Sequence, residues 1–246
     1  MTAPVDWLRS PSLTIFGKPV SDGNKTPILN FRTKIRLPAS DNKVKYPDCR
    51  VAVNLRTGVS DDVNEGRIEA DFSMKQFAMF IEQLKIAIQS PVDYKSPRIQ
   101  VFGVFAAQTF KPEVAKAYLL AGKRQGSVYV GIFSNSDRRP KIPMYFSVSK
   151  FDPLCDENGE TLSQELASPM LAAAYLSTLE ECFKRSNLAF EEVSQRHSLA
   201  EYAQRTGNTN TNNGGQNYNQ ATKPDTTPVA PAPKDGGFDF DDDIPF

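Results

Sequence analysis

Apolar and cationic residues alternate in two segments, and this alternation restricts the fold more than any other feature of the sequence. Within residues 27–38 and 49–56, apolar side chains recur at alternate positions, and mostly polar ones fill the positions between. A period of two places the apolar side chains on one face of a β-strand, as in an antiparallel sheet whose other face meets water. That second face then carries the cations Arg32, Lys34, Arg36, Arg50 and Arg56.

The remaining segments complete an order of three strands, a helix and further strands. The apolar stripe of residues 74–90 predicts a helix that begins after an N-cap at Ser73 and ends before Pro91. Residues 112–123 are expected to form a second, short helix that ends near Gly122. Further strands are expected at residues 12–16, 99–106, 127–134 and 142–151.

Residues after 168 are expected to be helical. Ser168 and Pro169 fit the N-cap and first position of a helix to about Arg185, and another helix is expected from Leu188 to about Arg205. The element order is that of an oligonucleotide-binding (OB) fold, a five-stranded Greek-key barrel, although other β-rich domains share this order. We therefore expect a mainly β protein in which residues 1–205 form an OB barrel with added helices.

Charge is sorted along the chain, although the formal net charge is zero. Residues 1–150 contain 23 Lys and Arg against 13 Asp and Glu, whereas residues 151–205 contain 4 against 10 and residues 206–246 contain 2 against 6. A basic first domain favours a polyanionic partner, while the acidic segments favour a basic partner or mask the chain's own basic surface.

The sequence favours a soluble cytoplasmic protein. It has no run of about 18 apolar residues that could span a membrane, and its first residues lack a signal pattern. Cys49, Cys155 and Cys182 are too few and too widely spaced to predict a disulfide framework or a zinc site.

No pattern in the sequence predicts catalysis. The single histidine, His197, lies in a charged helical stretch without an evident partner. The sequence contains no nucleophile elbow, no P-loop and no spaced metal-binding signature. The aspartates at 239–243 lack the fixed surroundings that a hydrolytic metal site needs. We therefore expect neither an enzyme nor a cofactor or metal site.

Several aromatic residues alternate with core positions in the later strands. If the aliphatic residues of those strands point inward, the rings on the opposite face are Phe102, Tyr129, Phe133 and Tyr145. Rings beside cations form a platform on which bases stack and phosphates are neutralised. We expect these rings to share a face with the five strand cations named above, and the basic loop residues Lys123, Arg124, Arg138, Arg139 and Lys141 to flank them. The alternatives are rings packed under the terminal helices and solvated loop charges.

Residues 206–237 are rich in Asn, Thr, Gly and Pro and nearly free of aliphatic side chains larger than Ala. Such a segment cannot bury enough apolar surface to order itself, so we expect a disordered linker. Residues 238–246 then form an acidic tip that ends in Ile-Pro-Phe. Its candidate partner-binding residues are Asp239, Asp241, Asp242, Asp243, Ile244, Pro245 and Phe246.

The sequence DFDDDIPF resembles the C-terminal tip of bacterial single-stranded DNA-binding proteins. The longer upstream domain is more similar in architecture to the single-stranded DNA-binding proteins of tailed bacteriophages. The resemblance implies a tip that recruits replication, recombination and repair proteins such as polymerases, helicases and nucleases. A ring and a carboxylate at Phe246, with aspartates that attract a basic rim, suit such docking.

We therefore expect a single-stranded DNA-binding protein, monomeric or homodimeric, that coats exposed strands and recruits enzymes. Two alternatives remain open: an adaptor that uses the tip without binding DNA, and a general binder of single and double strands.

Deleting residues 238–246 is expected to tighten binding to single-stranded DNA. A tethered acidic tip competes with DNA for basic surface, and salt screens this competition least at low ionic strength. The measurement is a fluorescence titration with oligo-dT at low and high salt. Equal affinities of the full and truncated chains at low salt would count against the competition.

Overall fold

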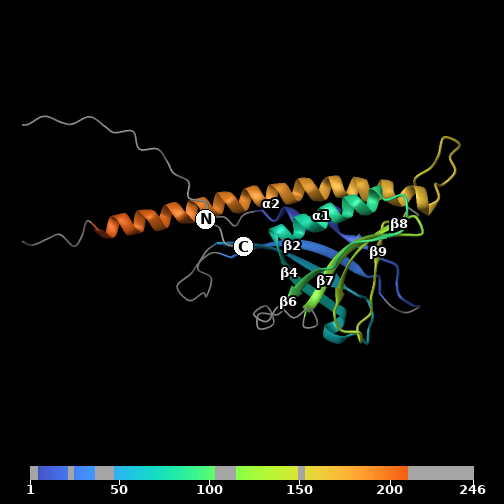
Figure 1. Ribbon diagram of the computed structural model, residues 1–246, viewed down its shortest axis with the longest axis horizontal. Coiled ribbons are helices and arrows are strands. Elements are labelled where there is room, and N and C mark those ends of the chain that lie inside the picture. The colour runs from blue at the N-terminus through green and yellow to red at the C-terminus, as the bar shows by residue number, and fades with distance from the viewer. Residues whose placement is uncertain (1–4, 22–24, 37–46, 103–114, 149–152, 210–246) are drawn as a thin grey trace, which may run out of the picture. The chain divides into compact units, whose positions relative to one another are not determined.

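Over its described residues the protein is mostly β, with two antiparallel sheets and two α-helices (Figure 1). The computed structural model describes residues 5–21, 25–36, 47–102, 115–148 and 153–209. Tertiary contacts divide the chain into residues 1–203 and 204–246, and both sheets belong to the first unit.

The first sheet has the order β1-β2-β3-β4. Its strands are β1 (Ile15–Phe16), β2 (Ile28–Arg36), β3 (Asp48–Arg56) and β4 (Arg67–Ser73). The alternation predicted for β2 and β3 is confirmed, because Leu29, Phe31 and Val53 are buried with exposed fractions of 1% or less. The predicted strand at 12–16 is shorter than expected, since the 3-10 turns η1 (Trp7–Arg9) and η2 (Pro11–Leu13) precede it.

Strand β4 was missed by the sequence analysis. It follows the 3-10 turn η3 (Val63–Gly66) and pairs with β3 along its whole length. Ile68, Ala70 and Phe72 alternate into the core. Glu69 and Asp71 occupy the other face, beside the cations of β2 and β3.

The second sheet has the order β5-β7-β8-β9, and β6 also pairs with β7. Its strands are β5 (Tyr94–Lys95), β6 (Ile99–Phe102), β7 (Ala115–Arg124), β8 (Ser127–Ser134) and β9 (Met144–Tyr145). A tight turn joins β7 to β8, with positive φ at Gln125 (49°) and Gly126 (72°), as two-residue hairpins require.

The helix predicted for residues 112–123 is wrong, because residues 115–124 form β7. Ala117, Leu119 and Ala121 point into the core, while Tyr118 and Leu120 belong to a separate cluster on the opposite face. Alanine, leucine and lysine favour helices, but pairing with β6 and β8 overrides this weak preference.

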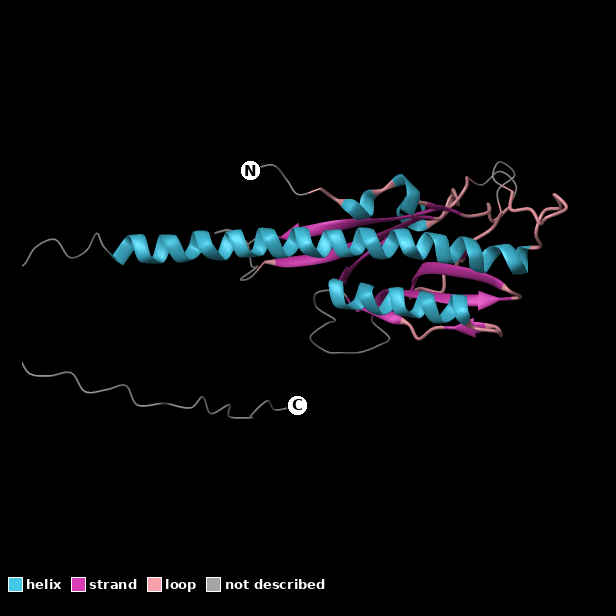
Figure 2. Ribbon diagram, turned by 90° about the horizontal axis from the view of Figure 1, so that it is seen from above, coloured by secondary structure: helices cyan, strands magenta, loops and turns pink. Residues whose placement is uncertain are grey.

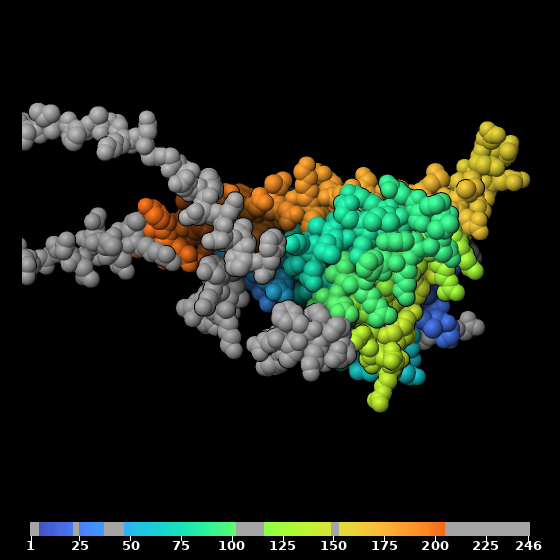
Figure 3. Space-filling view, in the orientation of Figure 1, coloured from blue at the N-terminus to red at the C-terminus, as the bar shows by residue number. Residues whose placement is uncertain are grey.

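Both sheets and both helices share one apolar core. Helix α1 (Met74–Gln89) begins with the predicted cap at Ser73, whose Oγ accepts the Gln76 N–H at 3.2 Å. Phe77 lies at the centre of the core, with its ring centroid 5.3 Å from that of Phe31 and 5.5 Å from those of Phe80 and Phe183. Helices α1 and α2 run side by side over the strands (Figure 2). Their side chains lie next to one another on the surface of the molecule (Figure 3).

Helix α2 (Gln164–Thr209) is one helix, whereas the sequence analysis predicted two. Ser168 does not cap it. Its Oγ instead accepts the Val128 N–H at 2.9 Å and attaches the helix to β8, and Pro169 lies inside the helix. The helix continues past the predicted end near Arg205 to Thr209.

Among the described residues, no strand pairing joins the two sheets into a closed barrel, although β4 contacts β7 and β8. Within the same residues, no helix is both long and apolar enough to cross a membrane.

Replacing Phe77 with alanine is expected to lower the free energy of unfolding by about 3–5 kcal/mol, because it leaves a cavity among three other rings. Met79→Ala is the control, since Met79 lies on the same helix and is 51% exposed. Its expected cost is within about 0.5 kcal/mol. Urea unfolding followed by circular dichroism measures both, and equal losses would contradict the central position of Phe77.

Candidate nucleic-acid interface

The second sheet turns an aromatic face away from the main core. Tyr118, Leu120 and Phe133 form a small buried cluster there, and Tyr129 packs against it. Two glycines leave room for these rings. A Cβ on Gly122 would lie 2.5 Å from the Tyr129 ring, and one on Gly131 would lie 2.5 Å from the Phe133 ring.

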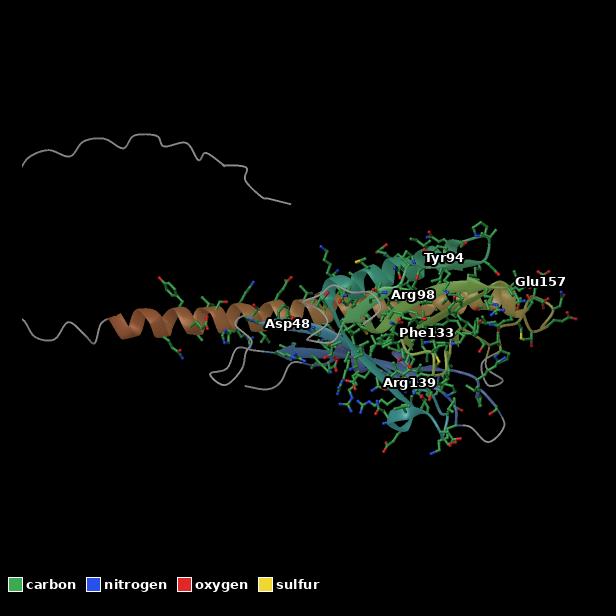
Figure 4. The ribbon with its side chains drawn as sticks, turned by 60° about the horizontal axis from the view of Figure 1, so that its bottom comes forward. Asp48, Tyr94, Arg98, Phe133, Arg139 and Glu157 are labelled. Carbon is green, nitrogen blue, oxygen red and sulfur yellow. The ribbon has the colours of Figure 1, made fainter. Side chains whose placement is uncertain are left out.

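Phe133 lies on the predicted face, but it is only 6% exposed. Its ring stacks on Tyr118 at a centroid distance of 5.5 Å, and the Arg98 guanidinium lies 4.4 Å above the Tyr118 ring. Figure 4 shows Arg98 and Phe133 in this part of the molecule. Phe133 therefore supports neighbouring rings and presents little surface to a base.

Tyr129 and Tyr145 are the half-buried rings of this face. They are paired residues of β8 and β9, and their ring centroids lie 5.4 Å apart. Burial, followed by the neighbouring Tyr145, raises the pKa of Tyr129 against the opposing charge of Arg124. Both rings are partly accessible surfaces.

Beside Tyr145 lies a groove with a volume of about 620 Å³. The β7–β8 turn, the segment before β9 and residues after β1 form its walls, and Lys18, Arg124 and Lys141 supply its cations. The Lys141 ammonium also donates to the Ser136 carbonyl at 2.9 Å. Burial lowers the pKa of Lys141, and the charges of Arg98 and Arg139 add to this effect. We call this the tyrosine groove.

The strand cations do not share a face with these rings, contrary to the sequence-based expectation. They belong to the first sheet, and carboxylates at 2.6–3.4 Å neutralise four of them. The ion pairs are Arg32–Glu69, Lys34–Glu69, Lys34–Asp71, Arg36–Asp71 and Arg50–Asp48. Strand β4, missed by the sequence analysis, supplies two of these carboxylates. Arg56 lies on the same sheet and lines a pocket.

Glu69 is the centre of this network. Burial raises its pKa, but hydrogen bonds from Lys34 and Arg32 and the charges of Lys34 and Arg67 outweigh burial and lower the pKa to about 2. The Glu69 carboxylate is therefore ionised in the folded protein at neutral pH.

Two of the cations that were predicted to lie in loops form contacts within the fold, and one of them, Lys123, belongs to strand β7. Arg139 donates through Nε and Nη2 to Asp62 at 2.9 and 2.8 Å, and its Nη1 donates to the Arg67 carbonyl at 3.0 Å. The side chains of this ion pair are 11% and 1% exposed, and Arg139 lies beside η3 (Figure 4). Lys123 donates to the Ser90 carbonyl at 2.6 Å. These contacts occupy Arg139 and Lys123, whereas Arg138 is exposed.

Some predicted site residues lie outside the described residues. They are the side chain of Phe102 and the tip residues from 238 to 246. The sequence analysis missed Lys18 of the tyrosine groove, because a single lysine near a short strand gives no sign of a binding site. It also missed the two glycines that make room for the rings: Gly122 lies opposite Tyr129 in the paired strand, and Gly131 lies two residues before Phe133 in the same strand. Within the described part of the chain, no cluster of His, Cys, Asp and Glu could hold a metal.

Glu69→Gln is expected to lower stability by about 1–2 kcal/mol at neutral pH, because three cations lose a charged acceptor. A depressed folded-state pKa stabilises above the ordinary value of 4.5, and this contribution disappears as pH falls toward about 2. The difference from the unmodified protein should therefore shrink between those pH values in urea titrations. Glu82→Gln is the control, because Glu82 is 65% exposed. A difference that stays constant down to pH 2 would contradict the network.

Known proteins supply no relative for this chain: no family model, no curated protein and no solved structure matches it.

Proposed function

We propose that this protein binds single-stranded DNA through the tyrosine groove. The observation that carries the proposal is the half-buried Tyr129–Tyr145 pair beside a groove lined by three cations. Bases stack on such rings with little sequence preference, and each stacked base contributes about 1–3 kcal/mol. Lysine and arginine beside the rings neutralise phosphates, which makes binding strongly dependent on salt.

The geometry favours unpaired strands over duplex. A base in a duplex is already stacked between its neighbours, whereas the tyrosine rings offer a face only to a base that is free to turn toward them. The groove cations alone do not distinguish the two forms. A general binder of single and double strands is therefore the second candidate, and competition with duplex separates it from the first.

The fold in this proposal is an OB-type barrel with added elements. Strands β2, β3 and β4, helix α1 and strands β7 and β8 follow the strand and helix order of that fold. Contacts of β4 with β7 and β8 support an arrangement in which the sheets meet at that edge.

The acidic tip belongs to the proposal on the strength of its sequence. Its resemblance to the tips of bacterial single-stranded DNA-binding proteins supports recruitment of replication, recombination and repair enzymes in a bacterial or phage-infected cytoplasm. The protein then coats strands through its folded unit and contacts other proteins through residues 238–246.

Replacing Tyr129 and Tyr145 together with alanine is expected to weaken oligo-dT binding by more than about 1 kcal/mol, because two stacking surfaces are lost. Tyr202→Ala is the control, since Tyr202 is a 68% exposed tyrosine on α2. Fluorescence anisotropy at several salt concentrations measures both variants. Unchanged affinity in the double variant would remove these rings from the site.

The same titrations test the groove cations. Arg124→Gln is expected to reduce the slope of log K against log salt by about 0.7, the value for one phosphate contact on a single strand. Glu82→Gln should leave that slope unchanged. Duplex that displaces oligo-dT at equal concentration would favour the general binder. If neither form of DNA binds, the result would favour an adaptor that uses the tip without binding DNA.

A further inference from the structure

A second pocket lies on the outer face of the first sheet, with a volume of about 430 Å³. Four arginines line it, and each comes from a different element. They are Arg9 of η1, Arg32 of β2, Arg56 of β3 and Arg67 of β4. We call this the arginine pocket. It shares no lining residue with the tyrosine groove.

The arginine pocket carries a net positive charge. Glu69 accepts from both Arg32 and Arg67, at 2.8 and 2.5 Å, so one carboxylate serves two guanidinium groups. Arg9 and Arg56 form no ion pair with any described residue. Guanidinium groups in such an array bind phosphate through paired hydrogen bonds.

Two asparagines from paired strands also line the pocket. Asn30 and Asn54 are register partners in β2 and β3. The Oδ1 atom of Asn54 is buried and accepts no hydrogen bond in the described structure. A buried acceptor without a donor is costly, so a rotation of the Asn54 amide that brings this atom to a ligand N–H gains affinity.

We propose that the arginine pocket binds one nucleotide, with its phosphate on the arginines and a base N–H donated to Asn54. Every standard base offers at least one N–H on its pairing edge, so the contact needs no particular sequence. The pocket volume falls within the range of about 300–1,000 Å³ typical of small-molecule sites.

The inference deepens the proposed function but uses different residues. The nucleotide has two possible sources: a unit of the bound single strand that continues from the tyrosine groove, or a free mononucleotide. Both present the same phosphate and base chemistry to the pocket.

Nuclear magnetic resonance on the full chain tests the pocket, with dTMP, inorganic phosphate and oligo-dT as probes. Addition of dTMP is expected to shift the side-chain amide signals of Asn54. The double variant Arg9→Gln/Arg56→Gln should weaken this response at least tenfold while leaving the Glu69 ion pairs intact. Lys184→Gln/Lys75→Gln removes two exposed cations elsewhere and should leave the response unchanged.

The outcomes separate the two proposals. The Asn54 response should persist in the Tyr129→Ala/Tyr145→Ala variant even if that variant no longer binds oligo-dT. Loss of the dTMP response when oligo-dT is present supports occupation by the strand, and its retention supports a free nucleotide. The inference is overturned if neither dTMP nor oligo-dT shifts the Asn54 signals, if the arginine and lysine variants respond equally, or if phosphate alone binds as tightly as dTMP.

Discussion

Burial of the inner faces of both sheets in one core is the constraint on which the rest of the structure depends. Phe77 and its neighbouring rings fill that core together with aliphatic residues from β2, β3, β7 and β8. Because the inner faces are fully used, ligand contact is left to the outer faces and the turns. The parity of each strand therefore decides which side chains can bind anything.

The carboxylates of β4 decide which outer-face cations are free. Glu69 and Asp71 engage Arg32, Lys34 and Arg36, so much of the first sheet's positive charge is compensated within the fold. Cations without an ion pair to any described residue line both the tyrosine groove on one sheet and the arginine pocket on the other. The count of basic residues in the sequence could not distinguish paired from available cations.

Strong, regular patterns could be predicted from the sequence. The period of two in β2 and β3 and the N-cap of α1 each depend on neighbouring residues alone. Strand β7 could not be recognised, because its alanines and leucines favour a helix until β6 and β8 pair with them. Strand β4 could not be predicted either, because the role of its acidic residues is evident only when they lie opposite the cations of β2 and β3.

The predicted site residues also divide into those that strand parity could place and those that it could not. Parity placed Tyr129 and Tyr145 on the face away from the core, where they lie together. Parity could not show that Phe133 is covered by its neighbours, that Arg139 is committed to Asp62, or that the strand cations belong to another sheet. These depend on contacts between residues far apart in the chain.

The most direct test of single-strand binding at the tyrosine groove is ultraviolet cross-linking of oligo-dT to the full chain, followed by mass spectrometry of the linked peptides. The account predicts cross-links at Tyr129 or Tyr145 that decline as salt rises. Cross-links confined to α1 or α2, with none in β8 or β9, would contradict it.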